Sequence, residues 1–320
     1  MSFVTLIYRP DDFSPGHLST TLERISDAYR PFAEKAGLTF RAIPIDELVP
    51  ACTDRPHLWW RGEDLLDTRQ CYQVDEFSWD PQTAHYLHAV YRTIEQSDSV
   101  LLGRTFDGPT HVVTDKLSII QRATRLGIRT PATVAIPFGR YARTVVPLIE
   151  KELGPGPYIV KPRELGMGFG ILKVDTTEQL NAAIDMVAQS GMGYLAQSFV
   201  PNTGDLRVYV IDGVVVAGQR RTPELGNYIS NISQGGSGRG GTVREDLAEA
   251  SLRIAADLNA SCLAVDWLLS EPGPALTEWC AGLGGFSGLP EPDRNELGNA
   301  FFRWARSLLE QPADERTRHA

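Results

Sequence analysis

Apolar and polar residues along this chain form short alternating runs typical of strands, separated by longer segments with the period of an amphipathic helix. Near the N-terminus, Phe3–Tyr8 predicts a strand, Leu18–Ala36 a helix and Leu38–Ile45 a second strand. A further apolar run at Ser99–Gly103 predicts the last strand of this segment. Strands that alternate with helices indicate a small α/β unit.

A second segment opens near Thr114, a residue type that often caps a helix N-terminus. We expect a helix from Asp115 to about Leu126 and then a strand, Ala132–Ile136, after the helix-breaking Gly127. Two more helices are expected, at Tyr141–Leu153 and Thr177–Ser190.

A third segment begins with the apolar run Tyr194–Val200. Several alternating runs follow it, and they predict a mixed sheet. Helices are expected at Glu245–Leu258 and Asn295–Leu309. Together the three segments indicate a chain of class α/β (α+β) with more than one domain.

The stretch Tyr158–Val174 holds a strand that ends at Lys161 and Pro162, followed by a loop with glycine at alternate positions: Gly166, Gly168 and Gly170. Such a loop lets backbone N–H groups approach an anion closely, and a lysine at the strand end suits a polyphosphate. Because the lysine precedes the glycines, this is not the usual phosphate loop. A plain hairpin turn with an exposed lysine is the alternative interpretation.

An Asp-Gly pair at 212–213 lies between two alternating runs and predicts a tight hairpin. The two-residue turn would place Asp205 opposite Arg220, with Arg207 and Tyr209 on the same face. These charged residues could form an ion pair on a solvated rim. Alternatively, the guanidinium groups of Arg207 and Arg220 could bind phosphate or acyl-phosphate oxygens.

A second hairpin is predicted with its turn near Pro272, and it would place Asp266 opposite Glu278. Cross-strand partners have Cβ atoms roughly 4.5–5.5 Å apart, a distance at which two carboxylates repel one another. A magnesium ion would offset this repulsion, since it favours one or two carboxylates together with phosphates. A turn that forms one residue away would separate the two acids.

The segment between the hairpins, 221–242, is polar, rich in glycine and too long for a tight turn. Loops of this length are commonly functional lids or disordered. Asn231, Gly235, Gly236 and Arg239 could close over a polyphosphate, and a flexible surface loop is the alternative.

Composition limits the classes of function. The net charge of −9 argues against a nucleic-acid partner, so any phosphate site must be built locally. No apolar run reaches the roughly 18 residues that span a bilayer. The four cysteines match neither a disulfide framework nor a zinc pattern. We therefore expect a cytoplasmic protein without a membrane partner, and a homo-oligomer stays open.

Taken in order, these motifs resemble those of ATP-grasp carboxylate–amine ligases, particularly the group of ribosomal-protein glutamate ligases and bacterial glutathione synthetase. The resemblance covers about Thr114–Gly288 and includes Asp115-Lys116, YIVKP with its glycine loop, GDLRVYVIDG, SNISQGGSG and VDWLL…LTEWC. It implies an ATP-grasp fold in which two antiparallel sheets hold ATP between them. The three expected domains are an N-terminal α/β unit (1–113), a central lid (114–193) and a C-terminal domain (194–320).

The resemblance also implies roles for individual residues. Lys116 and Lys161 would contact the ATP phosphates under the glycine loop. The hinge Gln197, Phe199 and Val200 would bind adenine, and Asp205 would lie near the ribose. The groups implied for the transferred phosphoryl are Arg207, Arg220 and Asn231, and those implied for Mg²⁺ are Asp266 and Glu278.

The family's reaction has two steps: a carboxylate takes the γ-phosphate of ATP to form an acyl phosphate, and an amine then displaces phosphate. The expected substrate is an amino acid or a small peptide. One departure bears on the metal site, because Cys280 stands where the family normally has asparagine, and a thiol is a poor ligand for magnesium. A maturase acting on a larger precursor peptide is one alternative function, and a non-catalytic nucleotide-binding module with a weakened metal site is another.

The substrate is less readable. The N-terminal run HLWWRGEDLL carries Trp59, Trp60 and Arg61, which could grip a carboxylate or a peptide. Packing of the aromatic rings into a core is the interpretation we favour.

Overall fold

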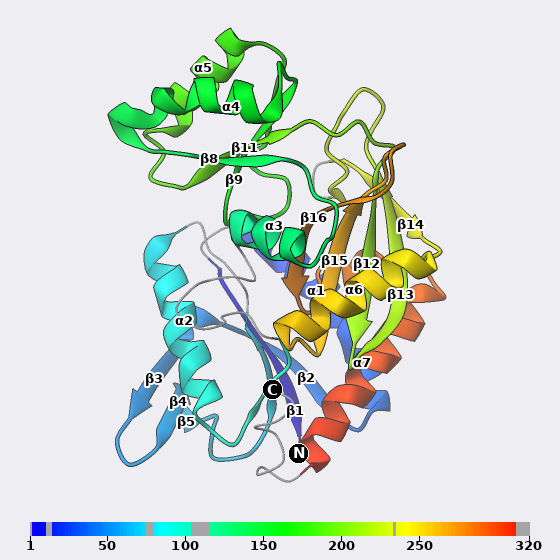
Figure 1. Ribbon diagram of the computed structural model, residues 1–320. Coiled ribbons are helices and arrows are strands. Elements are labelled where there is room, and N and C mark those ends of the chain that lie inside the picture. Colours follow the sequence, from blue (N-terminus) through cyan, green and yellow to red (C-terminus); the bar gives the residue numbers. More distant parts are fainter. Residues whose placement is uncertain (1, 11–14, 75–79, 104–114, 233–234, 312–320) are drawn as a thin grey trace.

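The computed structural model describes residues 2–10, 15–74, 80–103, 115–232 and 235–311. In these ranges the strands form four sheets, two in the N-terminal third and two in the rest of the chain (Figure 1). No helix in the described part is long and apolar enough to cross a membrane.

The first sheet is parallel, with strand order β2-β1-β6-β7. Helices α1 and α2 cover its two faces, since α1 packs with Val4 and Leu6, and α2 with Ile7. Its elements are β1 (Phe3–Tyr8), α1 (Pro15–Lys35), β2 (Thr39–Pro44), β6 (Cys71–Val74), α2 (Pro81–Glu95) and β7 (Val100–Leu101). The predicted strands and helix of this unit are confirmed within a few residues, whereas β6 and α2 were not predicted.

A small antiparallel sheet contains the tryptophans of the run HLWWRGEDLL. It comprises β3 (Leu48–Cys52), β4 (Pro56–Trp60) and β5 (Glu63–Asp64), preceded by the 3-10 turn η1 (Ile45–Glu47). Trp60 packs against the neighbouring core and donates to Glu47, which also pairs with Arg61. Trp59 is 40% exposed. None of Trp59, Trp60 and Arg61 lines the pocket described below. Of the two tryptophans, Trp60 packs against a core as expected, whereas Trp59 lies partly in solvent.

Helix α3 (Lys116–Arg125) opens the central part of the chain. Its N-cap is Asp115, whose carboxylate accepts the Leu117 N–H at 3.1 Å. The cap was expected at Thr114, which lies outside the described residues.

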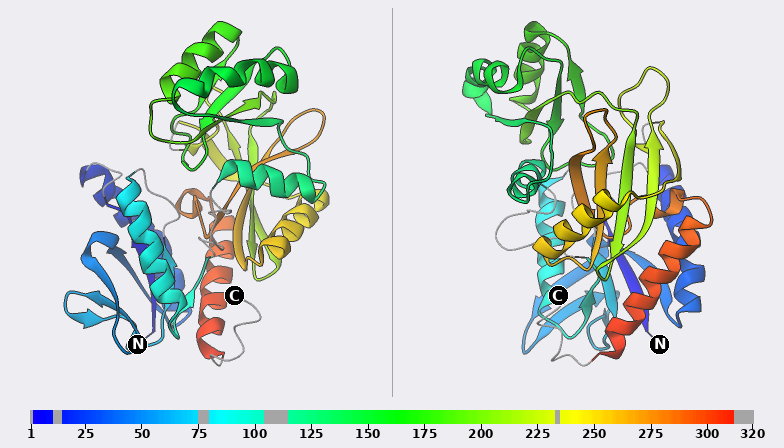
Figure 2. Two further views of the ribbon diagram at one scale, coloured as in Figure 1. Left: turned by 60° about the vertical axis from the view of Figure 1, so that its left-hand side comes forward. Right: turned by 45° about the vertical axis from the view of Figure 1, so that its right-hand side comes forward.

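The central part of the chain forms an antiparallel sheet, here called the lid sheet, with strand order β10-β9-β11-β8. Its strands are β8 (Thr133–Ile136), β9 (Tyr158–Pro162), β10 (Leu172–Val174) and β11 (Tyr194–Ser198). The 3-10 turn η2 (Gly139–Val145) and the helices α4 (Val146–Leu153) and α5 (Thr177–Val187) pack on it and project from the rest of the molecule (Figure 2). The sequence pattern places Tyr194–Val200 at the start of the third segment, but this strand, β11, pairs with β8 and β9 of the lid sheet. The domain boundaries given above stay a prediction.

The last sheet, here called the C-terminal sheet, is antiparallel with strand order β14-β13-β12-β15-β16. Helix α6 (Glu245–Leu258) covers one face, and helix α7 (Asp293–Glu310), with the 3-10 turn η4 (Phe286–Gly288), covers the other (Figure 1). The strands are β12 (Asp205–Ile211), β13 (Val214–Thr222), β14 (Ser237–Gly240), β15 (Cys262–Leu268) and β16 (Ala275–Ala281). Strand β14 was not predicted.

The register of the first hairpin differs from the prediction. Ile211 faces Val214 as expected, but a β-bulge between Tyr209 and Val210 adds one residue to β13. As a result Asp205 lies opposite Arg221, and Leu206 lies opposite Arg220. The expectation that Arg220 shares a face with Asp205 is therefore wrong.

The second hairpin has the predicted pairing, with Asp266 directly opposite Glu278. It also contains a bulge, between Asp266 and Trp267, but this bulge lies on the turn side of the acidic pair. The two carboxylates therefore stay on one face.

The register change predicts unequal effects for two adjacent arginines. Arg221 is buried and donates to both Asp205 and Asp266, at 2.5 and 2.8 Å, whereas Arg220 is half-exposed and donates to Thr203. Arg221→Met removes the arginine bonded to the buried Asp205 and one of the two arginines bonded to Asp266, and it should lower the free energy of unfolding by about 3–5 kcal/mol. Arg220→Met should lower it by less than about 1 kcal/mol.

Urea unfolding of both variants, compared with the unsubstituted chain, checks this prediction. Equal losses, or a larger loss for Arg220→Met, would contradict the bulged register.

Candidate active site

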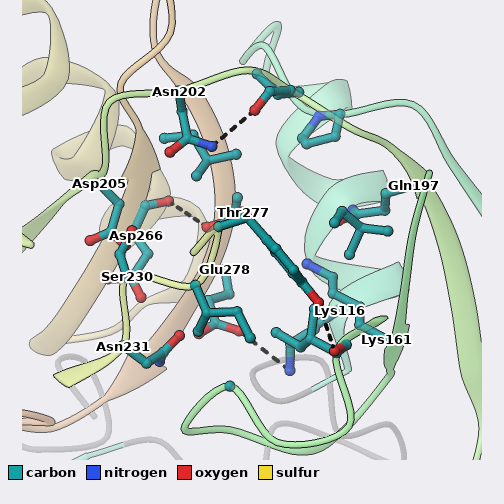
Figure 3. A pocket seen from close by; sticks show the side chains of 18 of the residues that line it. Lys116, Lys161, Gln197, Asn202, Asp205, Ser230, Asn231, Asp266, Thr277 and Glu278 are labelled. Atoms are coloured by element: carbon teal, nitrogen blue, oxygen red, sulfur yellow. Dashed lines mark hydrogen bonds and ion pairs between the residues drawn. The ribbon is translucent and has the colours of Figure 1, made fainter. Parts of the chain in front are cut away.

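A pocket lies between the lid sheet and the C-terminal sheet, and most of the charged residues singled out by the sequence line it (Figure 3). It encloses about 880 Å³ of empty space, a figure that includes its open mouth. Its ionisable lining residues are Lys116, Lys161, Asp205, Arg221, Asp266, Glu278 and Tyr228. Each sheet thus contributes charged groups to one cavity.

Two lysines, each 6% exposed, supply positive charge. Lys116 stands at the start of α3, where its Nζ donates to the Leu165 carbonyl and lies 3.3 Å from Glu278 Oε2. Lys161 is the fourth residue of β9. Burial, with the nearby charge of Lys116, lowers the pKa of Lys161 to about 8. The lid side of the pocket is therefore prepared for an anion.

Opposite the lysines, a buried ion-pair network occupies the C-terminal sheet. Arg207 donates to both oxygens of Asp266, from Nε and Nη2, at 2.7 Å each. Arg221 Nη2 donates to Asp266 Oδ2, and its Nε to Asp205 Oδ1. Arg207 lies behind Asp266 and does not line the pocket, whereas Arg221 does.

The two acids of this network have opposite pKa shifts. Burial opposes ionisation of Asp266, but Arg207 and Arg221 outweigh it and hold the pKa of this carboxyl well below its usual range. Burial raises the pKa of Asp205, and the nearby Asp266 charge adds to the effect, while Arg221 only partly offsets it. Asp266 is therefore the fixed negative charge of the site.

The glycine loop follows β9 and covers the pocket. Gly166 and Gly168 line the cavity, whereas Gly170 does not. Gly170 has a φ of +70°, and a Cβ there would lie 2.8 Å from Pro162 Cγ. Gly170 is thus needed for close packing of the loop against its own strand and not for contact with a ligand.

The hinge residues Gln197, Phe199 and Val200 all line the pocket. Gln197 Nε2 donates to Thr133 Oγ1 at 2.8 Å, and the Phe199 N–H donates to the Pro157 carbonyl at 3.0 Å. The Phe199 amide is therefore used within the hinge, and a nucleotide base would meet other groups of this backbone.

Ser230 and Asn231 line the pocket from the segment between the two hairpins, on the side of Asp205 and Asp266 (Figure 3). The Gly236 N–H donates to the Asn231 carbonyl at 3.1 Å and so supports this position. Arg239 lies on the edge strand β14, opposite Arg220, and neither arginine lines the pocket.

The donor set fits a magnesium ion bound through two carboxylates. Asp266 Oδ1 accepts one N–H of Arg207 and keeps a second lone pair, and Glu278 lies directly across from it. A Cβ at Gly284 would lie 3.3 Å from Cys280 Sγ and 3.1 Å from Arg207 Nη1, so the thiol packs beside the arginine under this turn. Among the described residues no group of three or more metal-binding side chains exists, so phosphates and water would complete the coordination.

Sequence reasoning missed Arg221, Thr277 and Tyr228 as lining residues. The tandem Arg220-Arg221 showed that an arginine would reach this face, but only the bulge decides which one. Thr277 is the residue that the second bulge adds beside Glu278, and it donates to the Asp266 carbonyl oxygen at 3.2 Å. Nothing in the sequence around Tyr228, which lies in the polar segment 221–242, indicates that it would line the pocket.

Comparison with known proteins agrees with this architecture. A curated relative from Parasynechococcus marenigrum, named "Probable alpha-L-glutamate ligase", is 25% identical over 91% of this chain and 68% of its own length. Another of the same name, from Xylella fastidiosa, is 30% identical over 61% of this chain and 63% of its own.

Two solved structures share the fold along nearly the whole chain. D-cycloserine synthetase DcsG matches with a TM-score of 0.68 at 14% identity, over 97% of this chain and 99% of its own. D-alanyl-alanine synthetase A from Vibrio cholerae matches with a TM-score of 0.70 at 14% identity, over the same shares.

The family model of the RimK-like ATP-grasp domain matches residues 113–286, which include every residue placed around the pocket above. This span is more than half of the chain and corresponds to the part carrying α3, the lid sheet and the C-terminal sheet. The chain belongs to the RimK-like ATP-grasp family and is an ATP-grasp carboxylate–amine ligase.

Proposed function

We propose that this ligase joins a carboxylate to an amine through an acyl phosphate made with ATP, and that its substrates are amino acids or small peptides. The observation that carries the proposal is the division of charge across one pocket. Lys116 and Lys161 approach from the lid side, and Arg221, Asp266 and Glu278 from the C-terminal sheet. A triphosphate between them would meet cations on both sides.

ATP would lie with its base at the hinge Gln197–Val200 and its ribose near Asp205. Its phosphates would lie under Gly166 and Gly168, within reach of Lys116 and Lys161. Mg²⁺, held by Asp266 and Glu278, would neutralise phosphate charge during the transfer.

In the first step an oxygen of the substrate carboxylate attacks the γ-phosphorus. The bond from that phosphorus to the bridging oxygen breaks, and ADP leaves with the electron pair. Arg221 and Asn231 would donate hydrogen bonds to the transferred phosphoryl oxygens. Arg207 would act through Asp266, because it lies behind this carboxylate.

In the second step the amine nitrogen attacks the acyl carbon, inorganic phosphate leaves and the nitrogen loses a proton. The acyl phosphate reacts readily with water, so the glycine loop and the segment at Ser230–Asn231 must exclude it. Positioning and electrostatic stabilisation would supply most of the catalysis.

L-glutamate is proposed as one of the two substrates, because the curated relatives carry the name alpha-L-glutamate ligase. A larger precursor peptide is an alternative, since the ligase PsnB, whose structure with a precursor peptide shares this fold with a TM-score of 0.62, takes such a partner. At 14% identity that likeness supports the shared fold.

One observation favours a second candidate, a nucleotide-binding module without turnover. Asp266 has three of its lone pairs occupied by Arg207 and Arg221, and Cys280 replaces the family's asparagine. Glu278, whose carboxylate has an ion pair with Lys116, would then carry most of the metal binding. Loss of metal binding would leave the nucleotide site in place.

Removal of the Glu278 carboxylate should separate binding from turnover. We expect Glu278→Ala to lower magnesium-dependent ADP release at least a hundredfold, while metal-free ADP affinity changes by less than about fivefold. The assay supplies ATP, L-glutamate and a panel of amino acids and short peptides. Glu271→Ala, in the exposed turn after β15, is the matched control and should keep the activity.

ADP binding without turnover of any panel member by the unsubstituted chain would favour the non-catalytic module. Cys280→Asn adds a second readout: a raised magnesium affinity would show that the thiol weakens the site.

The lowered pKa of Lys161 predicts a pH dependence of nucleotide affinity. A bound polyphosphate favours the ammonium form, so above a pKa of about 8 binding must be accompanied by proton uptake. Affinity for metal-free ADP should fall from pH 7.5 to 9.5, by up to about tenfold per pH unit above the pKa.

Calorimetry in buffers of different ionisation enthalpy measures both the affinity and the proton uptake. Lys161→Met should bind more weakly and lose most of this dependence. A pH-independent affinity of the unsubstituted chain would show that Lys161 does not contact the phosphates.

A further inference from the structure

Tyr228 forms a link between the two sides of the pocket that the ligase chemistry does not by itself require. Its hydroxyl donates to the Ile171 carbonyl at 3.2 Å and accepts the Lys173 N–H at 3.1 Å. Both groups belong to the backbone on either side of Leu172 in β10, directly after the glycine loop. Tyr228 itself lies in the segment between the hairpins of the C-terminal sheet.

The contact is specific because β10 is an edge strand of the lid sheet. An edge strand presents backbone N–H and C=O groups without a strand partner, and the Tyr228 hydroxyl satisfies one of each. The hydroxyl therefore bonds one carbonyl and one N–H of this edge at the same time, as the backbone of a neighbouring strand would.

Tyr228 is held in position from its own side. Asn227 Oδ1 accepts the backbone N–H groups of Tyr228 and Ile229, at 2.8 and 3.2 Å. Residues 224–227 are exposed, Tyr228 is half-buried and Ser230 is buried. The chain therefore reaches the pocket at Tyr228. Ser230 and Asn231, two and three residues further on, also line it (Figure 3).

The glycine loop is thus held at both ends by side chains from outside the lid sheet. Lys116 Nζ donates to the carbonyl of Leu165 at the start of the loop, and Tyr228 holds Ile171 at its end. A phosphate would compete with Leu165 for the Lys116 ammonium, because a charged acceptor binds more strongly than a neutral carbonyl. The Tyr228 contact lies at the other end of the loop and involves neither Lys116 nor Lys161.

We propose that Tyr228 is a positioning residue that clamps the end of the glycine loop to the segment carrying Asn231, so that nucleotide is retained while the acyl phosphate awaits its amine. The inference rests on ATP occupying this pocket and is independent of the acceptor substrate.

Tyr228→Phe tests the clamp, because it removes the hydroxyl and keeps the ring. Displacement of N-methylanthraniloyl-ADP by excess ADP in a stopped-flow instrument gives the dissociation rate, which should rise threefold to thirtyfold. Hydrogen exchange of the Lys173 amide in the nucleotide complex should speed up by a similar factor. A purely structural tyrosine would not change these two readouts together.

Tyr158→Phe is the matched control. The Tyr158 hydroxyl donates to the Gly154 carbonyl inside the lid, so its loss removes a hydrogen bond without touching the clamp. It should leave nucleotide dissociation within twofold of the unsubstituted chain. Equal effects of the two substitutions, or an unchanged dissociation rate in Tyr228→Phe, would overturn the inference. Failure of the unsubstituted chain to bind the labelled ADP would overturn the nucleotide site as well.

Discussion

The buried carboxylate of Asp266 is the constraint on which the candidate site depends. At 2% exposure it stays ionised only because Arg207 and Arg221 donate three hydrogen bonds to it. These partners come from two neighbouring strands, so the charge fixes how β12, β13 and β15 align. On β12 the same face carries Tyr209 and Ile211 in the core near α7 and Asp205 and Arg207 towards the pocket. The hydrophobic core and the site are therefore two ends of one sheet surface.

Charge balance links this network to the lid. The pocket is lined by three acids, Asp205, Asp266 and Glu278, and by three bases, Lys116, Lys161 and Arg221. A polyphosphate entering such a site adds negative charge beside Glu278, and a divalent cation accompanying it restores the balance. Burial lowers the pKa of Lys161 and the charge of Lys116 lowers it further, so the two buried ammonium groups repel one another. The anion would relieve their mutual repulsion.

The sequence predicted elements that depend on local pattern and failed where pairing geometry decides. Strand Phe3–Tyr8 and helix Glu245–Leu258 have the predicted bounds, and the opposition of Asp266 and Glu278 is confirmed. Arg220 was predicted in place of Arg221, because one bulged residue reverses every side chain beyond it and leaves no mark in the sequence. Helix α2 was missed although Asp80 caps it and Leu87, Val90, Tyr91 and Ile94 have helical spacing. The roles of the individual site residues stay predictions.

The central claim is that the pocket makes an acyl phosphate, and trapping that species with hydroxylamine tests it most directly. The chain is incubated with ATP, Mg²⁺, hydroxylamine and carboxylates that include L-glutamate and short glutamyl peptides. Mass spectrometry then measures the hydroxamate, which forms when hydroxylamine replaces the natural amine. We predict a hydroxamate that requires both ATP and Mg²⁺ and disappears in Glu278→Ala. Normal ADP binding with no hydroxamate from any carboxylate, and no ADP release, would contradict the account.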